Sequence, residues 1–316
     1  MTSPGQPRDH HYLPRFYLRM FLNADSELEV FDRYAKRYMT KPPGAIAFAR
    51  DYYTVDLEDE KDSAELEKAF GKIETIAKPI FDKIATGASL TRAERQDFGM
   101  FIALQNFRVP DAEKGIVEGT QKMYKAVRQR MMSMTGTHPE AFAASQKKAG
   151  ELFGYPSPLT PEDWIRAAGE EVEVDVPKEY VRRIMLDVAL ESGPQLADMD
   201  WEVLHAPKGT AFILSDSPCV ILNQGDSPFR SMGILSPGAL KAMPLSKESC
   251  LLIRDRSIMP TLVHKNCPRK LARFINNLIA LNSDKYVLSH NKALLQRIVM
   301  TTKVDQYIRT QRVQVN

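Results

Sequence analysis

The spacing of the apolar residues changes twice along this chain of 316 residues. Residues 27–31 nearly alternate between acidic and apolar side chains, which is typical of a short, half-buried strand. From about residue 62 to residue 192, apolar side chains recur every three or four positions, as on the buried face of amphipathic helices. Beyond residue 198, short apolar runs are separated by clusters of Gly, Pro, Ser and Asp, which are typical of strands and turns. The two changes of period predict an α+β protein.

The helical segment carries start and stop signals. Thr91 and Glu94 have the spacing of a capping box, which predicts a helix that begins there and runs to Phe107 or Arg108. Pro110 is expected to end this helix, because the residue before a proline avoids the helical region. Further helical patterns cover residues 66–84, 111–134, 138–150, 161–169 and 177–191.

The first strand is expected to join strands near the C-terminus, because an isolated two-stranded hairpin is only marginally stable in water. Expected strands cover residues 27–31, 52–55, 201–205, 211–214, 219–222, 250–254 and 286–289, and two further helices cover 268–281 and 291–301. We therefore predict one domain over residues 1–316, in which an N-terminal strand joins a C-terminal mixed or antiparallel sheet. Residues 10–56 and 198–301 form its strand-rich core, and residues 62–192 form a helical lobe between them.

Composition narrows the choice of partners and compartment. The net charge of +3 is too balanced to indicate nucleic acid or an anionic membrane by itself. No run approaches the about 18 apolar residues that a membrane span requires, and the N-terminus has no apolar segment typical of a signal peptide. The three cysteines have wide, unequal spacing, so we expect them to be reduced and structural. The protein is therefore predicted to be cytoplasmic, with its oligomeric state left open.

The stretch HYLPRFYLRMF, residues 11–21, is unusually rich in aromatic and basic residues for a chain terminus. Pro14 suits the first turn of a helix, so residues 14–22 are expected to be helical with His11 just ahead. Arg15 and Arg19 would lie one turn apart, where like charges destabilise a helix by about 0.2 to 0.5 kcal/mol unless an anion or carboxylate lies between them. Either His11 and the arginines form an anion pocket, or they cap the helix and pair with acidic residues of the helical lobe.

Two later segments supply polar residues that could converge on the same site. Gln105 and Arg108 continue the apolar stripe of their helix, although Arg108 could instead bind the last carbonyl groups of that helix. Ser215 and Asp216 follow an expected strand, at a position where functional residues are common. The alternative for this pair is a turn, since Asp and Ser before proline favour one.

Familiar catalytic and cofactor motifs are absent from the sequence. It contains no phosphate-binding loop of the G-x-x-x-x-G-K-[ST] kind, no G-x-G-x-x-G, no H-E-x-x-H and no G-x-S-x-G. No cofactor is therefore indicated, and no metal site is required by the spacing of the histidines. Two basic clusters, residues 122–130 and 265–273, are either solvated faces or surfaces for a phosphate backbone.

Four short motifs resemble, in order, those of the bacterial family known as domain of unknown function 4238. The opening stretch is similar to its H-Y-x-P-x-F-Y-L-x-x-F run, and residues 105–110 to its Q-x-x-R-x-P helix end. Residues 212–218 resemble its F-I-x-S-D-x-P strand end, and residues 244–246 its P-L-S segment. The resemblance spans roughly residues 10–290 and implies domain boundaries and a motif list, without implying a reaction.

Two functions remain open at this point. The first is a hydrolase of the phosphodiesterase or nuclease type, with His11 as general acid or base, Arg108 stabilising an anionic transition state, and Asp216 orienting the histidine or holding a divalent metal. Arg15, Arg19, Gln105 and Ser215 would bind the substrate. The second is a non-catalytic binding or regulatory protein for a small anionic ligand or a partner, nucleic acid included. The hydrolase requires His11, Arg108 and Asp216 to share one cleft.

Overall fold

The computed structural model describes residues 9–50, 60–137, 175–223, 234–256 and 258–306, together with helical positions 140, 144, 147 and 148. It separates into two compact units, one of Met1–Glu113 with Arg182–Asn316 and the other of Lys114–Val181. The strand expected at residues 52–55 and the helix expected at 161–169 lie outside the described residues, as does most of the helix expected at 138–150. The prediction of one domain over residues 1–316 stays a prediction.

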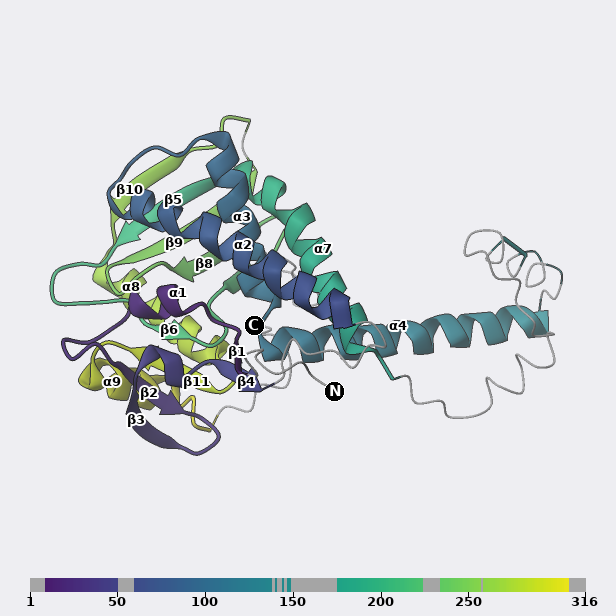
Figure 1. Ribbon diagram of the computed structural model, residues 1–316, viewed down its shortest axis with the longest axis horizontal. Coiled ribbons are helices and arrows are strands. Elements are labelled where there is room, and N and C mark those ends of the chain that lie inside the picture. The colour runs from purple at the N-terminus through teal and green to yellow at the C-terminus, as the bar shows by residue number, and fades with distance from the viewer. Residues whose placement is uncertain are drawn as a thin grey trace. The chain divides into compact units, whose positions relative to one another are not determined.

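A five-stranded mixed sheet forms the larger part of the strand-rich core (Figure 1). Its β10 runs parallel to β5, whereas the pairs β5–β9, β9–β8 and β8–β7 are antiparallel. In order across the sheet, the strands are β10 (Leu262–Asn266), β5 (Met199–His205), β9 (Ser249–Arg256), β8 (Ala239–Pro244) and β7 (Val220–Asn223).

A second, four-stranded sheet joins the two ends of the chain. In this antiparallel sheet Val30 lies opposite Leu288, which confirms that the N-terminal strand pairs with a C-terminal one. Its order is β3 (Arg37–Lys41), β2 (Leu28–Asp32), β11 (Tyr286–Ser289) and β6 (Leu214–Ser215). A separate pair, β1 (Asp9–His11) with β4 (Phe48–Arg50), holds the segment just before the aromatic stretch.

Helices cover both faces of the sheets, so adjacent residues of a strand enter different cores. Leu251 and Ile253 of β9 belong to a core shared with α2 (Glu60–Ala85) and α3 (Arg92–Phe107). Leu252, between them, belongs to a second core with α8 (Arg269–Asn282) and α9 (Lys292–Thr302). Figure 1 shows α2 and α3 over the five-stranded sheet, where Phe98 of α3 contacts Trp201 of β5. Burial on both faces explains the unbroken apolar run at residues 250–253 of β9.

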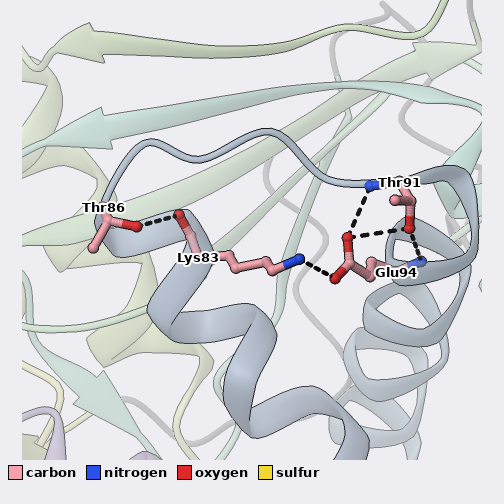
Figure 2. A network of polar contacts seen from close by, with 4 residues as sticks. All are labelled: Lys83, Thr86, Thr91 and Glu94. Carbon is pink, nitrogen blue, oxygen red and sulfur yellow. Dashed lines mark hydrogen bonds and ion pairs between the residues drawn. The ribbon is translucent and has the colours of Figure 1, made fainter.

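The helix start predicted from the sequence is present. The Thr91 hydroxyl accepts a hydrogen bond from the Glu94 N–H at 3.2 Å, and the Glu94 carboxylate accepts one from the Thr91 N–H at 2.9 Å. Figure 2 shows that the same carboxylate also pairs with Lys83 near the end of α2. The capping box therefore ends the connection between α2 and α3 at a defined residue.

The described residues between 60 and 197 contain helices and no strands, as expected. They include α4 (Pro110–Thr137) and α7 (Lys178–Ala197) in addition to α2 and α3. Pro110 is the first residue of α4, a position where its missing N–H is not needed.

The aromatic stretch at the N-terminus is anchored in the first core. It forms a short helix, α1 (Arg15–Arg19), directly after Pro14. Tyr17 is fully buried against Phe81 and Phe101, with ring centroids 5.6 and 6.2 Å away, and its hydroxyl donates a hydrogen bond to the Pro244 carbonyl oxygen. This terminus is therefore part of the core that positions the polar residues beside it.

Candidate functional site

Arg108 connects the end of α3 to two other segments. Its side chain is buried, and its guanidinium donates hydrogen bonds to the Glu74 carboxylate of α2 and to the backbone carbonyl oxygen of His11. The Arg108 backbone N–H meanwhile bonds to the Leu104 carbonyl and closes α3, at a distance of 2.8 Å. The structure thus brings together two of the predicted catalytic residues, through the main chain of His11.

The His11 imidazole is half-buried beside Phe48, with ring centroids 5.6 Å apart. Burial lowers the pKa of His11, and the positive charges of Arg15 and Arg108 lower it further. A backbone hydrogen bond at Gly44 and the charge of Glu74 act in the opposite direction. Its Nε2 atom is buried and has no hydrogen-bond partner among the described residues. The ring therefore favours the neutral form and has an unused polar atom.

Gln105 lies one turn before Arg108 on the same side of α3 and is fully buried. Neither its amide nitrogen nor its amide oxygen has a hydrogen-bond partner in the described part of the chain. A buried polar group left unsatisfied destabilises a fold by about 1 to 3 kcal/mol. Gln105 is therefore poorly explained by stability, and it is the residue that most favours a ligand site.

Arg15 and Arg19 are both exposed on α1, and neither forms an ion pair with a described carboxylate. Arg15 is close to the cluster, because its charge lowers the pKa of His11 and its guanidinium carbon would lie 3.9 Å from a methyl group added at Gly44. Arg19 is one turn further along, and no described contact links it to His11 or Arg108. Arg15 therefore supplies positive charge at the edge of the cluster.

Ser215, the last residue of β6, and Asp216, which follows it, lie at a different place, beside β11. The Asp216 carboxylate accepts hydrogen bonds from the backbone N–H groups of Asp284, Lys285 and Tyr286 at 2.9, 2.7 and 2.9 Å. Burial raises the pKa of Asp216 to about 6, with a contribution from the charge of Asp284 and partial opposition from these hydrogen bonds. The described contacts of this carboxylate include neither His11 nor Arg108.

Ser215, unlike Asp216, forms side-chain hydrogen bonds within its own segment. Its hydroxyl donates to the Ser217 carbonyl oxygen at 2.9 Å and accepts from the Ser217 N–H at 3.3 Å. Ser215 therefore has the local contacts expected of the turn-forming alternative, whereas the carboxylate of Asp216 binds a segment about 70 positions away.

Two contributors to the cluster have no signal in the sequence. Glu74 lies on α2 at 34 positions from Arg108, and Gly44 is on the 3₁₀ turn Pro43–Ala45. Neither belongs to a recognisable motif, because their roles depend on which segments meet in space. Only a search for a carboxylate that could balance Arg108 would have pointed to the acidic residues of α2.

No described group of three or more His, Cys, Asp or Glu side chains is arranged to hold a metal ion. His205 and His264 do stack, with Nε2 and Nδ1 2.9 Å apart, at the parallel pair β5–β10. The thiols of Cys219, Cys250 and Cys267 are buried and form no disulfide. In the part of the chain that the structure describes, no helix has both the length and the apolarity to cross a membrane.

The fold is α+β, with a helical segment inserted between an N-terminal strand and the C-terminal strands that it pairs with. A family model described as a protein of unknown function, DUF4238, matches residues 9–293. The chain belongs to this family, which confirms the family resemblance inferred from the sequence. No curated protein and no solved structure matches the chain.

Proposed function

We propose that the chain is a binding protein for a small anionic ligand, held by His11, Gln105 and Arg15 beside the buried Arg108. The observation that carries the proposal is the set of unused polar atoms around Arg108, namely His11 Nε2 and both amide atoms of Gln105. Buried polar groups are almost always satisfied in a native protein, and exceptions require an explanation. A ligand that supplies their partners is such an explanation.

Local charge favours an anion. The charge of Arg108 is balanced by Glu74, and His11 favours its neutral form. Arg15 then adds an unbalanced positive charge at the edge, exposed and without an ion pair to a described carboxylate. An anionic group near Arg15 would gain a charge-assisted hydrogen bond, while polar atoms deeper in the ligand would reach His11 and Gln105.

Hydrolysis is the second candidate, and the lowered pKa of His11 favours it. A neutral imidazole can accept a proton from water or from a substrate hydroxyl group, as a general base does. Asp216, the group expected to orient that histidine, is occupied by three backbone N–H groups elsewhere. Binding therefore explains the arrangement better than catalysis, because binding does not require an acidic residue that orients His11.

The variant Gln105→Leu separates binding from a packing role. Leucine removes the unsatisfied amide and keeps a side chain of similar size, so the free energy of unfolding should rise by about 1 to 3 kcal/mol. We expect the number of inorganic phosphate ions bound per chain, measured by isothermal titration calorimetry, to fall at the same time. Gln195→Leu on α7 is the control, since that amide bonds to the Glu191 carbonyl oxygen of its own helix at 3.3 Å.

Unchanged phosphate binding by a stabilised Gln105→Leu variant would remove the binding proposal. The hydrolase is tested with bis(p-nitrophenyl) phosphate, with and without Mg²⁺ or Mn²⁺. Hydrolysis that His11→Asn abolishes, and that in the unaltered protein falls as the pH drops through the pKa of His11, would favour catalysis. Equal release of p-nitrophenol by both proteins would exclude it.

A further inference from the structure

A polar cavity lies between α8, α9 and the segment before β6, in the unit that contains both sheets. Its volume is about 770 Å³, within the range of about 300 to 1,000 Å³ typical of small-molecule sites. Both helices lie near the C-terminal end of the chain, toward the yellow end of the colour scale in Figure 1. None of the residues discussed around Arg108 lines it.

The lining carries positive charge and, among the described residues, no carboxylate. Arg269 and Arg273 are one turn apart on α8, and Arg297 faces them from α9. Arg269 donates a hydrogen bond to the Lys208 carbonyl oxygen at 2.8 Å, which fixes it to the wall. Arg273 and Arg297 form no ion pair with a described residue, and two uncompensated guanidinium groups in the lining of one cavity favour a bound anion.

Two neighbouring asparagines of α8 line the cavity and differ in their hydrogen bonding. The Asn276 amide is satisfied at both ends, since it accepts from the Ile213 N–H at 3.1 Å and donates to the Ala211 carbonyl at 2.8 Å. The Oδ1 atom of Asn277 is buried without a hydrogen-bond partner among the described residues. His290 also lines the cavity, and its Nδ1 atom is likewise buried without a hydrogen-bond partner among the described residues. Asn276 therefore builds the cavity, whereas Asn277 and His290 have polar atoms to offer.

We propose that this cavity binds a small phosphorylated compound with a hydroxyl-bearing body, of the sugar phosphate class. The phosphate would lie between Arg273 and Arg297, where two guanidinium groups can each donate paired hydrogen bonds. The first turn of α8 helps, because Pro268 provides no side-chain cap and leaves N–H groups that favour an anion. The hydroxyl groups would donate to Asn277 Oδ1 and bond to His290 Nδ1. The proposal is independent of the site around Arg108.

The test is calorimetric titration of the full chain with ribose 5-phosphate, ribose and inorganic phosphate. We expect ribose 5-phosphate to bind more tightly than phosphate, and ribose to bind weakly or not at all. The double variant Arg273→Gln/Arg297→Gln should lose about tenfold or more in affinity, because charge-assisted hydrogen bonds are lost. Arg183→Gln, an exposed arginine on α7, is the matched control and should bind as the unaltered protein does.

A second variant tests the sugar half of the site. Asn277→Leu should reduce the affinity for ribose 5-phosphate toward that for inorganic phosphate, with phosphate binding itself unchanged. Gln105→Leu should leave ribose 5-phosphate binding intact, so failure at one site is distinguishable from failure at the other. Equal affinities of the double variant and Arg183→Gln, or no ribose 5-phosphate binding at millimolar concentration, would overturn the proposal. So would a single-stranded oligonucleotide that binds through Arg273 and Arg297 when ribose 5-phosphate does not.

Discussion

The guanidinium of Arg108 donates a hydrogen bond to the backbone carbonyl oxygen of His11, 97 positions earlier in the chain. Because the acceptor belongs to the main chain, this bond survives any substitution of the His11 side chain. The arginine therefore holds the N-terminal segment in place whether or not the imidazole binds a ligand. Arg108 therefore has the structural role of anchoring the N-terminal segment, and the His11 imidazole is available to bind a ligand.

Arg108→Met should lower the free energy of unfolding by about 1 to 3 kcal/mol, because it leaves the His11 carbonyl oxygen and the Glu74 carboxylate without this donor. His11→Ala should have a smaller effect on stability. Urea denaturation followed by circular dichroism measures both. Arg92→Met serves as the control, since its pair with Asp198 is 78% exposed on the arginine side and should contribute less than about 1 kcal/mol. Equal stability of Arg108→Met and Arg92→Met would contradict the anchoring role.

Gly99 of α3 and Gly193 of α7 allow their two helices to approach closely. A Cβ atom at Gly99 would lie 2.4 Å from the Gly193 carbonyl oxygen, and one at Gly193 would lie 2.3 Å from the Met100 side chain. Gly99→Ala should therefore destabilise by about 1 to 3 kcal/mol through overpacking, although alanine favours helices. Gly71→Ala on α2 is the control, since nothing lies within 4 Å of its added methyl group. A melting temperature for Gly99→Ala at or above that of Gly71→Ala would refute the close contact.

Lys241 is buried on β8 of the five-stranded sheet, where the contact described for its ammonium group is the Met199 sulfur at 3.5 Å. Burial lowers the pKa of Lys241, partly offset by the charge of Asp255. Because the folded-state pKa lies below the unfolded value, the charged ammonium group destabilises the fold fully below the folded-state pKa. This loss decreases as pH rises from the folded-state pKa to the unfolded-state pKa. Lys241→Met should stabilise by about 1 to 3 kcal/mol at neutral pH, as measured by urea denaturation.

Lys265→Met is the comparison for this prediction. Lys265 is 58% exposed and pairs with Glu202 at 3.0 Å, so its removal should lower the free energy of unfolding by less than about 1 kcal/mol. If Lys241→Met proved less stable than the unaltered protein, the buried ammonium group would need a favourable partner that outweighs its burial.

The pKa of Asp216, raised to about 6 from a usual value of 3.8, predicts a pH dependence of stability. Between these two values the unfolded carboxyl loses its proton while the folded one keeps it, so the free energy of unfolding should fall as pH rises. Asp216→Asn does not titrate, and the difference in stability between the two proteins should follow this trend. Stability rising with pH, relative to Asp216→Asn, would mean that the three backbone hydrogen bonds outweigh burial.

Local features of the sequence predicted those elements whose causes lie within a few residues. Thr91 and Glu94 form the capping box that their spacing predicted, since both partners lie in one helical turn. The alternation of residues 27–31 predicted β2, and the marginal stability of a lone hairpin predicted that it would pair near the C-terminus. The spacing of apolar residues indicates which face of a helix or strand is buried, and this spacing depends only on residues close together in the sequence.

The candidate site was predictable only in part. Sequence reasoning selected His11 and Arg108, which the structure connects, and also Asp216, whose described partners are three backbone N–H groups of residues 284–286. It gave no indication of Glu74, because a carboxylate on a helix surface is usually solvated. The sequence indicated the polar cavity between α8 and α9 only through the basic cluster of residues 265–273, which includes Arg269 and Arg273.

The sequence by itself therefore determined the α+β class, the helix boundaries set by capping box and proline, and the aromatic stretch that must be buried. Only the tertiary structure decided which carbonyl oxygen Arg108 reaches, which N–H groups Asp216 binds, and that Arg297 faces Arg273 across a cavity. The physical reason is that local conformation depends on neighbouring residues, whereas these contacts join segments far apart in the chain. Their geometry depends on how the two sheets and their covering helices pack, and no short-range pattern encodes that packing.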